Sequence, residues 1–271
     1  MSRILVSHNT LYEYEEPVRY AVQRIFLSPR LETHRRIIRW EVDSNADLFQ
    51  YKDSLGNMMH ILVVSKPTRS ISIDISGEVE VTKFKRTKTA LVKKPSVKNF
   101  KDSTGTPLDY FRCQTLLTTP NSEIISLAKS ICRSITISNL LALAKAIETK
   151  ITYTKGATNV ATSATEAWEK KAGVCQDHAH VMLSACRSLG LPARYVSGYL
   201  KGQARASEAT HAWVEVWLQK WLGIDVTHFK IIDDQFLSLA VGLDYGHASP
   251  VRGFRQGGGI ETMEVEVSVT S

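Results

Sequence analysis

Hydrophobic and polar residues alternate in several short stretches of the first hundred residues, which is the period of a half-buried β-strand. The alternating stretches span residues 36–42 and 70–83, and residues 57–64 are apolar enough for a buried strand. Turn-forming segments at residues 43–47 and 53–57 separate them, and few helical patterns intervene. Several short strands at this spacing predict an antiparallel β domain of sandwich or barrel type.

The hydrophobic period lengthens to three and four residues after about residue 101, which predicts helices. The predicted helices span residues 122–133, 138–150, about 163–173 and 175–189. Ser122 and Ser138 stand where they can cap the first two, and Ser163 or Thr165 begins the third. Strands are then predicted at residues 193–200, 211–218, 221–226 and 263–269.

Helices followed by an antiparallel sheet form an α+β order. The chain is therefore expected to divide into three parts. These are an N-terminal β domain over residues 1–105, an α+β core over 106–235, and a C-terminal extension over 236–271 that carries a final strand.

The net charge of +7 is concentrated in residues 83–101, where Lys and Arg occur without any acidic residue. No nucleic-acid motif accompanies them, so a solvated surface is expected and no nucleic-acid partner is predicted. No run of 18 apolar residues is present, which predicts no membrane span. The start of the chain has no long apolar leader, and a cytoplasmic location is expected.

The four cysteines are widely spaced, which indicates free thiols rather than a disulfide framework. Cys113 and Cys132 are expected to be ordinary buried apolar residues. Cys175 differs because it opens its predicted helix, where backbone N–H groups and the helix dipole stabilise a thiolate. Gly173 leaves room for a substrate carbonyl, and the N–H groups of the first turn can hold an oxyanion. Cys186, in the middle of the same helix, has none of these features.

A thiolate nucleophile needs a base, and His211 begins a predicted strand from which its ring can reach the helix end. Asp225, on the next strand, can hold the ring nitrogen that faces away from the sulfur. The register of these two strands decides whether His211 and Asp225 can meet, and the sequence does not fix that register. His211 opposes Asp225 only if the connection is centred on Leu218, and a two-residue turn would pair Asp225 with Val214 on the other face.

These residues stand in motifs that resemble the core of the bacterial transglutaminase-like proteins. The motifs are Gly173-Val-Cys175-Gln-Asp177-His-Ala-His180, His211-Ala-Trp213-Val-Glu215-Val and Trp221-Leu-Gly-Ile-Asp225-Val-Thr227. The N-terminal segments Tyr12-x-Tyr14-x-x-Pro17, Leu27-x-Pro29-Arg30 and Asp53-x-x-Gly56-Asn57 are similar to the β region that these proteins carry. The similarity extends over nearly the whole chain.

The resemblance implies a papain-like α+β core behind a β-sandwich, with Cys175, His211 and Asp225 as a catalytic triad. It implies acyl-enzyme chemistry on a peptide or protein amide, with water or an amine as acceptor. Family members are often described as cysteine proteases. No cofactor and no metal are expected. Gln176, Tyr153 and Trp213 are further candidates for substrate binding or for the oxyanion site.

Two positions depart from the family pattern. His178 stands where an aromatic such as Phe is usual, and His228 stands where the family motif Asp-Pro-Thr-Asn has its Asn. Both bear on substrate selection more than on the triad.

Two other functional classes remain open from the residues alone. Cys175, His178, His180 and His211 suggest a zinc site, but residues two apart on a helix do not converge, and no Cys-x-x-Cys or His-Glu-x-x-His is present. A catalytically idle binding module on the same fold is the other alternative, since fold does not prove activity. The pattern predicts neither the oligomeric state nor the choice between hydrolysis and transfer.

Overall fold

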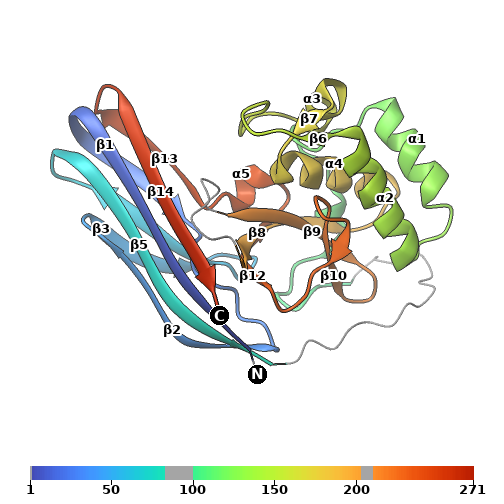
Figure 1. Ribbon diagram of the computed structural model, residues 1–271, viewed down its shortest axis with the longest axis horizontal. Coiled ribbons are helices and arrows are strands. Elements are labelled where there is room, and N and C mark those ends of the chain that lie inside the picture. The colour runs from blue at the N-terminus through green and yellow to red at the C-terminus, as the bar shows by residue number, and fades with distance from the viewer. Residues whose placement is uncertain (1, 83–99, 203–209) are drawn as a thin grey trace.

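The computed structural model describes residues 2–82, 100–202 and 210–271. Two largely antiparallel sheets form the molecule, and the helices lie with the second sheet, away from the first (Figure 1). This is the α+β architecture that the sequence predicts. Most of the basic stretch 83–101 lies outside the described residues. Within those residues, no helix has the length and apolar character to cross a membrane.

The first sheet is built around one long strand, β1 (Ser2–Ile25), which has 24 residues. Its first half pairs with β5 (Thr68–Val81) and β14 (Glu261–Thr270). Its second half pairs with β4 (Met58–Val64) and β13 (Val251–Gly257). The two outer strands are β2 (Arg35–Ser44), beside β5, and β3 (Asp47–Lys52), beside β4. Buried residues of both halves share one hydrophobic core, because alternate side chains point inward.

The second sheet has five strands in the order β11-β10-β9-β8-β12. They span Ala193–Leu200 (β8), His211–Trp217 (β9), Trp221–Asp225 (β10), Lys230–Ile231 (β11) and Phe236–Gly242 (β12). The helices are α1 (Ser122–Ile131), α2 (Ile137–Lys150), α3 (Ala164–Lys170), α4 (Cys175–Ser188) and the short α5 (Tyr245–Ala248). Three short elements complete the chain: a 3₁₀ helix η1 (Leu108–Arg112), and a parallel pair of β6 (Thr152–Tyr153) with β7 (Ala172–Gly173).

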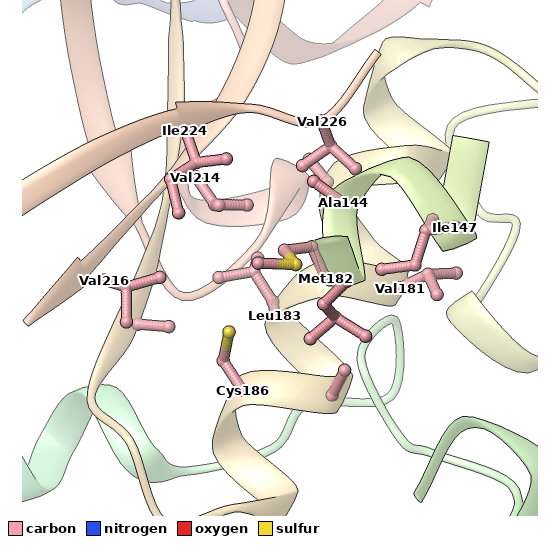
Figure 2. Close-up of a cluster of buried hydrophobic side chains, with 14 of the residues drawn as sticks. Ala144, Ile147, Val181, Met182, Leu183, Cys186, Val214, Val216, Ile224 and Val226 are labelled. Carbon is pink, nitrogen blue, oxygen red and sulfur yellow. The ribbon is translucent and has the colours of Figure 1, made fainter. Parts of the chain in front are cut away.

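Helix α4 is the centre of the core. Val181, Met182, Leu183 and Cys186 pack among residues of α2, β9 and β10, as Figure 2 shows. The sulfur of Cys186 lies within this apolar cluster, and burial raises the pKa of its thiol. Cys132 is also buried in this core, as expected. Cys113 is exposed, contrary to the expectation, because it follows η1 at the surface.

The helix starts differ slightly from those predicted. Asn121, not Ser122, caps α1 by accepting the Ile124 N–H at 2.9 Å. Thr136, not Ser138, caps α2. Ser163 does cap α3, in a reciprocal capping box with Glu166. In each corrected case the cap lies one or two residues before the predicted serine, because Asn and Thr serve the same role.

The segment 236–271 is divided between the two sheets. Strand β12 pairs with β8 at the edge of the second sheet, whereas β13 and β14 return to β1 in the first (Figure 1). Leu237 and Leu239 of β12 and Tyr199 of β8 belong to the hydrophobic core of the first sheet. The two sheets therefore pack directly on each other through β8 and β12.

Candidate active site

The start of helix α4 is fixed by a buried carboxylate. Oδ2 of Asp177 accepts the Val174 N–H at 2.8 Å and the Thr158 hydroxyl at 2.6 Å. A Cβ on Gly173 would lie 2.7 Å from the Asp177 side chain, so only glycine allows this approach. Burial raises the pKa of Asp177, while these hydrogen bonds act in the opposite direction. The result is a rigid turn that presents Cys175 as the first residue of the helix.

Asp225 binds one ring nitrogen of His211. Nε2 of His211 lies 3.0 Å from Oδ2 of Asp225, and the carboxylate is fully buried. His211 opens β9 and Asp225 ends β10, so both side chains lie at the same end of the sheet. Because Nε2 is engaged by Asp225, Nδ1 is the nitrogen left to interact with the sulfur of Cys175.

The register differs from both options left open by the sequence. Trp221 pairs with Trp217, and Ile224 with Val214. Gln219, with φ at 68°, is the centre of the connection, which therefore has an odd number of residues. Extending this register by one residue places Asp225 across from Trp213, on the same face as His211. The two triad residues meet diagonally rather than as a directly opposed pair.

The site favours a charged imidazole. Burial alone lowers the pKa of His211, but hydrogen bonds to Asp225 and Cys175, and the charges of both, raise this pKa to about 10. Burial likewise raises the pKa of Asp225, but the hydrogen bonds from His211 and His228 hold it well below its usual range. The site is thus suited to a thiolate–imidazolium pair backed by an ionised carboxylate.

A cavity of about 180 Å³ opens beside Cys175 and His211. Cys175, half-buried, lines it together with His211, Gln176 and Tyr153. Gln176 also donates from its side-chain nitrogen to the Asn159 carbonyl at 3.3 Å. Trp213 does not line the cavity. It is fully buried, and its ring packs against Phe236 at 5.4 Å between centroids.

Tyr195 and Tyr245 complete the cavity wall, and sequence reasoning missed both. Burial, followed by the charge of Cys175, raises the pKa of each tyrosine, so both keep their hydroxyl proton. Tyr195 lies on β8 and Tyr245 on α5, after the predicted core ends. Only the return of the chain past β12 brings Tyr245 into the cavity that Cys175 lines.

The histidines on α4 do not gather as the zinc hypothesis requires. His178 lies 2.9 Å from the Ile151 carbonyl through Nε2 and 3.1 Å from the Thr227 hydroxyl through Nδ1. Nε2 of His180 accepts the Tyr245 N–H at 3.1 Å. Each ring therefore binds a different segment of the chain around the site. In the described part of the chain, neither belongs to a cluster of metal-ligand side chains.

Comparisons with known proteins give the family of the chain. Residues 125–226 match the model of the transglutaminase-like superfamily, and residues 4–80 match the bacterial transglutaminase-like N-terminal region. The uncharacterized protein ML0607 of Mycobacterium leprae is 30% identical over 284 residues, which cover 100% of this chain and 99% of that protein. The chain belongs to the transglutaminase-like superfamily.

Two further proteins are similar to this transglutaminase-like chain, one in fold and one in part of its sequence. A crystal structure of "a Putative Cysteine Protease from Cytophaga hutchinsonii" superposes with a TM-score of 0.78, at 20% identity, over 98% of this chain and 90% of that one. This likeness shows a shared fold. A protein-glutamine gamma-glutamyltransferase of Pseudomonas aeruginosa is 34% identical over 71 residues, which are 22% of this chain and 11% of that protein.

Proposed function

We propose that this transglutaminase-like chain catalyses thiol-dependent acyl transfer or hydrolysis at amide bonds through Cys175, His211 and Asp225. The single observation that carries the proposal is the position of His211. Its Nε2 is held at 3.0 Å by a buried Asp225, and its interaction with Cys175 raises its pKa at the mouth of a cavity. A histidine held on one side and coupled to a thiol on the other is the arrangement that activates a nucleophile.

The reaction follows from this pair. The Cys175 thiolate attacks the amide carbonyl carbon, and the C=O electron pair moves to oxygen. Collapse of the tetrahedral intermediate breaks the C–N bond, and Nδ1–H of His211 gives its proton to the leaving amine. Water or a second amine then attacks the thioester, while Nδ1 takes up the proton of the incoming nucleophile. The thiolate leaves and the starting pair is restored.

The oxyanion needs donors at the start of α4. The first N–H groups of an α-helix have no acceptor within the helix, so those of Cys175 and Gln176 are available. The side chains of Gln176 and Tyr153 line the same cavity and are the candidates for a further donor. The expected substrate is a peptide or protein amide, with an amine as alternative acceptor to water.

The test is detection of an acyl adduct. The protein is incubated with a peptide library with and without a primary amine, and its intact mass is measured. A thioester adduct on the native chain, absent from Cys175→Ala, supports the proposal. A native chain that never gains the adduct, while iodoacetamide labels Cys175 no faster than exposed Cys113, identifies a catalytically idle binding module instead.

A further inference from the structure

His228 contacts the triad but has no role in the reaction described above. Its Nδ1 lies 2.7 Å from Oδ2 of Asp225, the same oxygen that binds His211 at 3.0 Å. The rings of the two histidines are 5.6 Å apart between centroids. The ligand atoms of His211, Asp225 and His228 all lie within 4.8 Å of one another. Two imidazoles thus converge on one carboxylate oxygen.

We propose that His211, Asp225 and His228 form an inhibitory binding site for a divalent transition-metal ion such as Zn²⁺. Imidazole nitrogen and carboxylate oxygen are zinc ligands, and three protein ligands leave a fourth position for water. Ligand atoms around tetrahedral zinc lie about 3.3 Å apart, given bond lengths of about 2.0–2.1 Å. The two histidine–carboxylate distances, 2.7 and 3.0 Å, are shorter than this spacing, so the side chains would move apart slightly to admit the ion.

The surroundings suit an ion at this point. The backbone N–H of His228 donates to Oδ1 of Asp225 at 3.3 Å, which orients the carboxylate and leaves Oδ2 toward the two rings. The side chain of His228 is 52% exposed, whereas Asp225 is fully buried. An ion can therefore arrive from solvent on the His228 side and reach the buried ligands without opening the core.

Metal binding must displace protons. A carboxylate can only accept, so both histidines donate N–H to Asp225 when no metal is present. The metal would replace the Nε2 proton of His211, which passes to solvent, and His228 would carry its proton on Nε2. Because the metal and this proton compete for the same nitrogen, the apparent affinity should increase with pH.

Inhibition follows from the single proton that remains on His211, and this step rests on the proposed function. With the metal on Nε2, giving the Nδ1 proton to the leaving amine would leave a metal-bound imidazolate instead of a neutral ring. The ring would then be a weaker acid than the imidazolium, so breakage of the C–N bond would slow. Asp225 would also direct its charge to the ion instead of to the imidazolium. The reaction would stay slow until the metal is removed.

The first test measures zinc binding directly, by equilibrium dialysis and calorimetry at pH 7.5. The native protein and Cys175→Ala should each bind one ion, because the sulfur is not a ligand. His228→Asn keeps a side-chain donor near Asp225 but lacks the imidazole, and its affinity should fall at least tenfold. Loss of binding in Cys175→Ala, or unchanged binding in His228→Asn, would overturn the proposal.

The chain offers a matched control. Nδ1 of His247 lies 2.8 Å from Oδ1 of Asp244, with the same three-residue spacing, and the His247 side chain is 50% exposed. No third ligand joins this pair in the described parts of the chain. His247→Asn should therefore leave the zinc affinity unchanged. A loss equal to that of His228→Asn would mean that any exposed Asp–His pair binds the ion, which contradicts a three-ligand site.

The inhibitory effect is measured as the rate at which the thioester adduct forms on Cys175. Zinc should slow adduct formation by the native protein, and EDTA should restore it. His228→Asn should need at least tenfold more zinc for the same fractional slowing of its own rate. Zinc that binds the native protein but leaves this rate unchanged would overturn the inhibitory role. If no amide substrate is ever turned over, the dialysis result still decides the metal site.

Discussion

One oxygen atom of Asp225 organises the candidate site. It is buried, it accepts from His211 and from His228, and its negative charge is the reason that an imidazolium is stable at the end of β9. A buried carboxylate with charged hydrogen-bond partners contributes far more than an exposed one, because few water molecules screen it. The negative charge of Asp225, rather than its shape alone, is therefore what the proposed reaction would need.

Asp225→Asn tests this charge. Asparagine fills nearly the same volume, but it removes the charge that holds His211 as an imidazolium. We expect the acyl-transfer rate to fall by about 10²–10⁴-fold, as for the loss of the orienting carboxylate in other triads. Steady-state kinetics and iodoacetamide labelling of Cys175 measure the loss. Asp244→Asn, at the second Asp–His pair, is the control and should have a much smaller effect; equal losses would argue against the triad.

The raised pKa of His211 also predicts how stability depends on pH. Its pKa moves from 6.5 to about 10 on folding, so the folded state binds the proton more tightly than the unfolded chain. The stabilisation from His211 is fully present below pH 6.5 and is lost progressively as the pH rises toward 10. Urea unfolding between pH 6 and 10 should show the native protein losing stability faster than His211→Gln. Parallel curves for the two proteins would contradict the raised pKa.

At the scale of single elements, the start of α4 has two roles. Most helix caps only satisfy backbone N–H groups, as Ser163 does for α3. Asp177 additionally binds both Val174, the residue before Cys175, and Thr158. The same hydrogen bonds that begin the helix therefore also orient Cys175.

Two alanine variants separate these roles. Ser163→Ala should lower the free energy of unfolding by about 1 kcal/mol and leave Cys175 labelling unchanged. Asp177→Ala should lower it by about 1–3 kcal/mol, since charged hydrogen bonds are lost, and should also slow labelling. Chemical denaturation gives the stabilities, and intact mass gives the labelling rates. Equal labelling of Cys175 in both variants would show that Asp177 serves the fold alone.

The elements that could be predicted from the sequence carry local signals. The span of α4 follows from its apolar face and from Gly190, whose φ of 75° ends the helix. The register of β9 and β10 could not be predicted, because Gln219 takes a left-handed conformation without the glycine that usually marks one. The contact of His228 with Asp225 lies only three residues away in the chain, but whether both rings reach one oxygen depends on the sheet register.

At the scale of the whole molecule, long-range pairing was the part that the sequence could not predict. Strand β1 pairs with four other strands, two of them from the C-terminal segment, and no local pattern specifies such partners. The same C-terminal segment places β12 at the edge of the second sheet, against the core of the first, and Tyr245 in the cavity. The candidate site is thus completed by residues that follow the triad, and the two sheets cannot be treated as independent units.

Asn57 joins the sheets at this junction. It is fully buried and directly precedes β4. Its side chain makes two hydrogen bonds to Val241 of β12: Oδ1 accepts the Val241 N–H, and Nδ2 donates to the Val241 carbonyl, each at 2.9 Å. Because β12 is an edge strand, these two backbone groups point away from β8 and have no sheet partner there. The side-chain amide of Asn57, next to the first sheet, therefore satisfies two backbone groups on the edge strand of the second sheet.

Asn57→Ala would leave both groups of Val241 buried without their partners. Each unsatisfied group costs about 1–3 kcal/mol, so we expect a loss of roughly 3 kcal/mol in the free energy of unfolding. Asn45→Ala removes an exposed amide that bonds the Ser70 carbonyl in the same sheet, and should cost less than about 0.5 kcal/mol. Urea unfolding followed by circular dichroism compares the two. If Asn57→Ala were as mild as Asn45→Ala, the amide bridge would have no structural role.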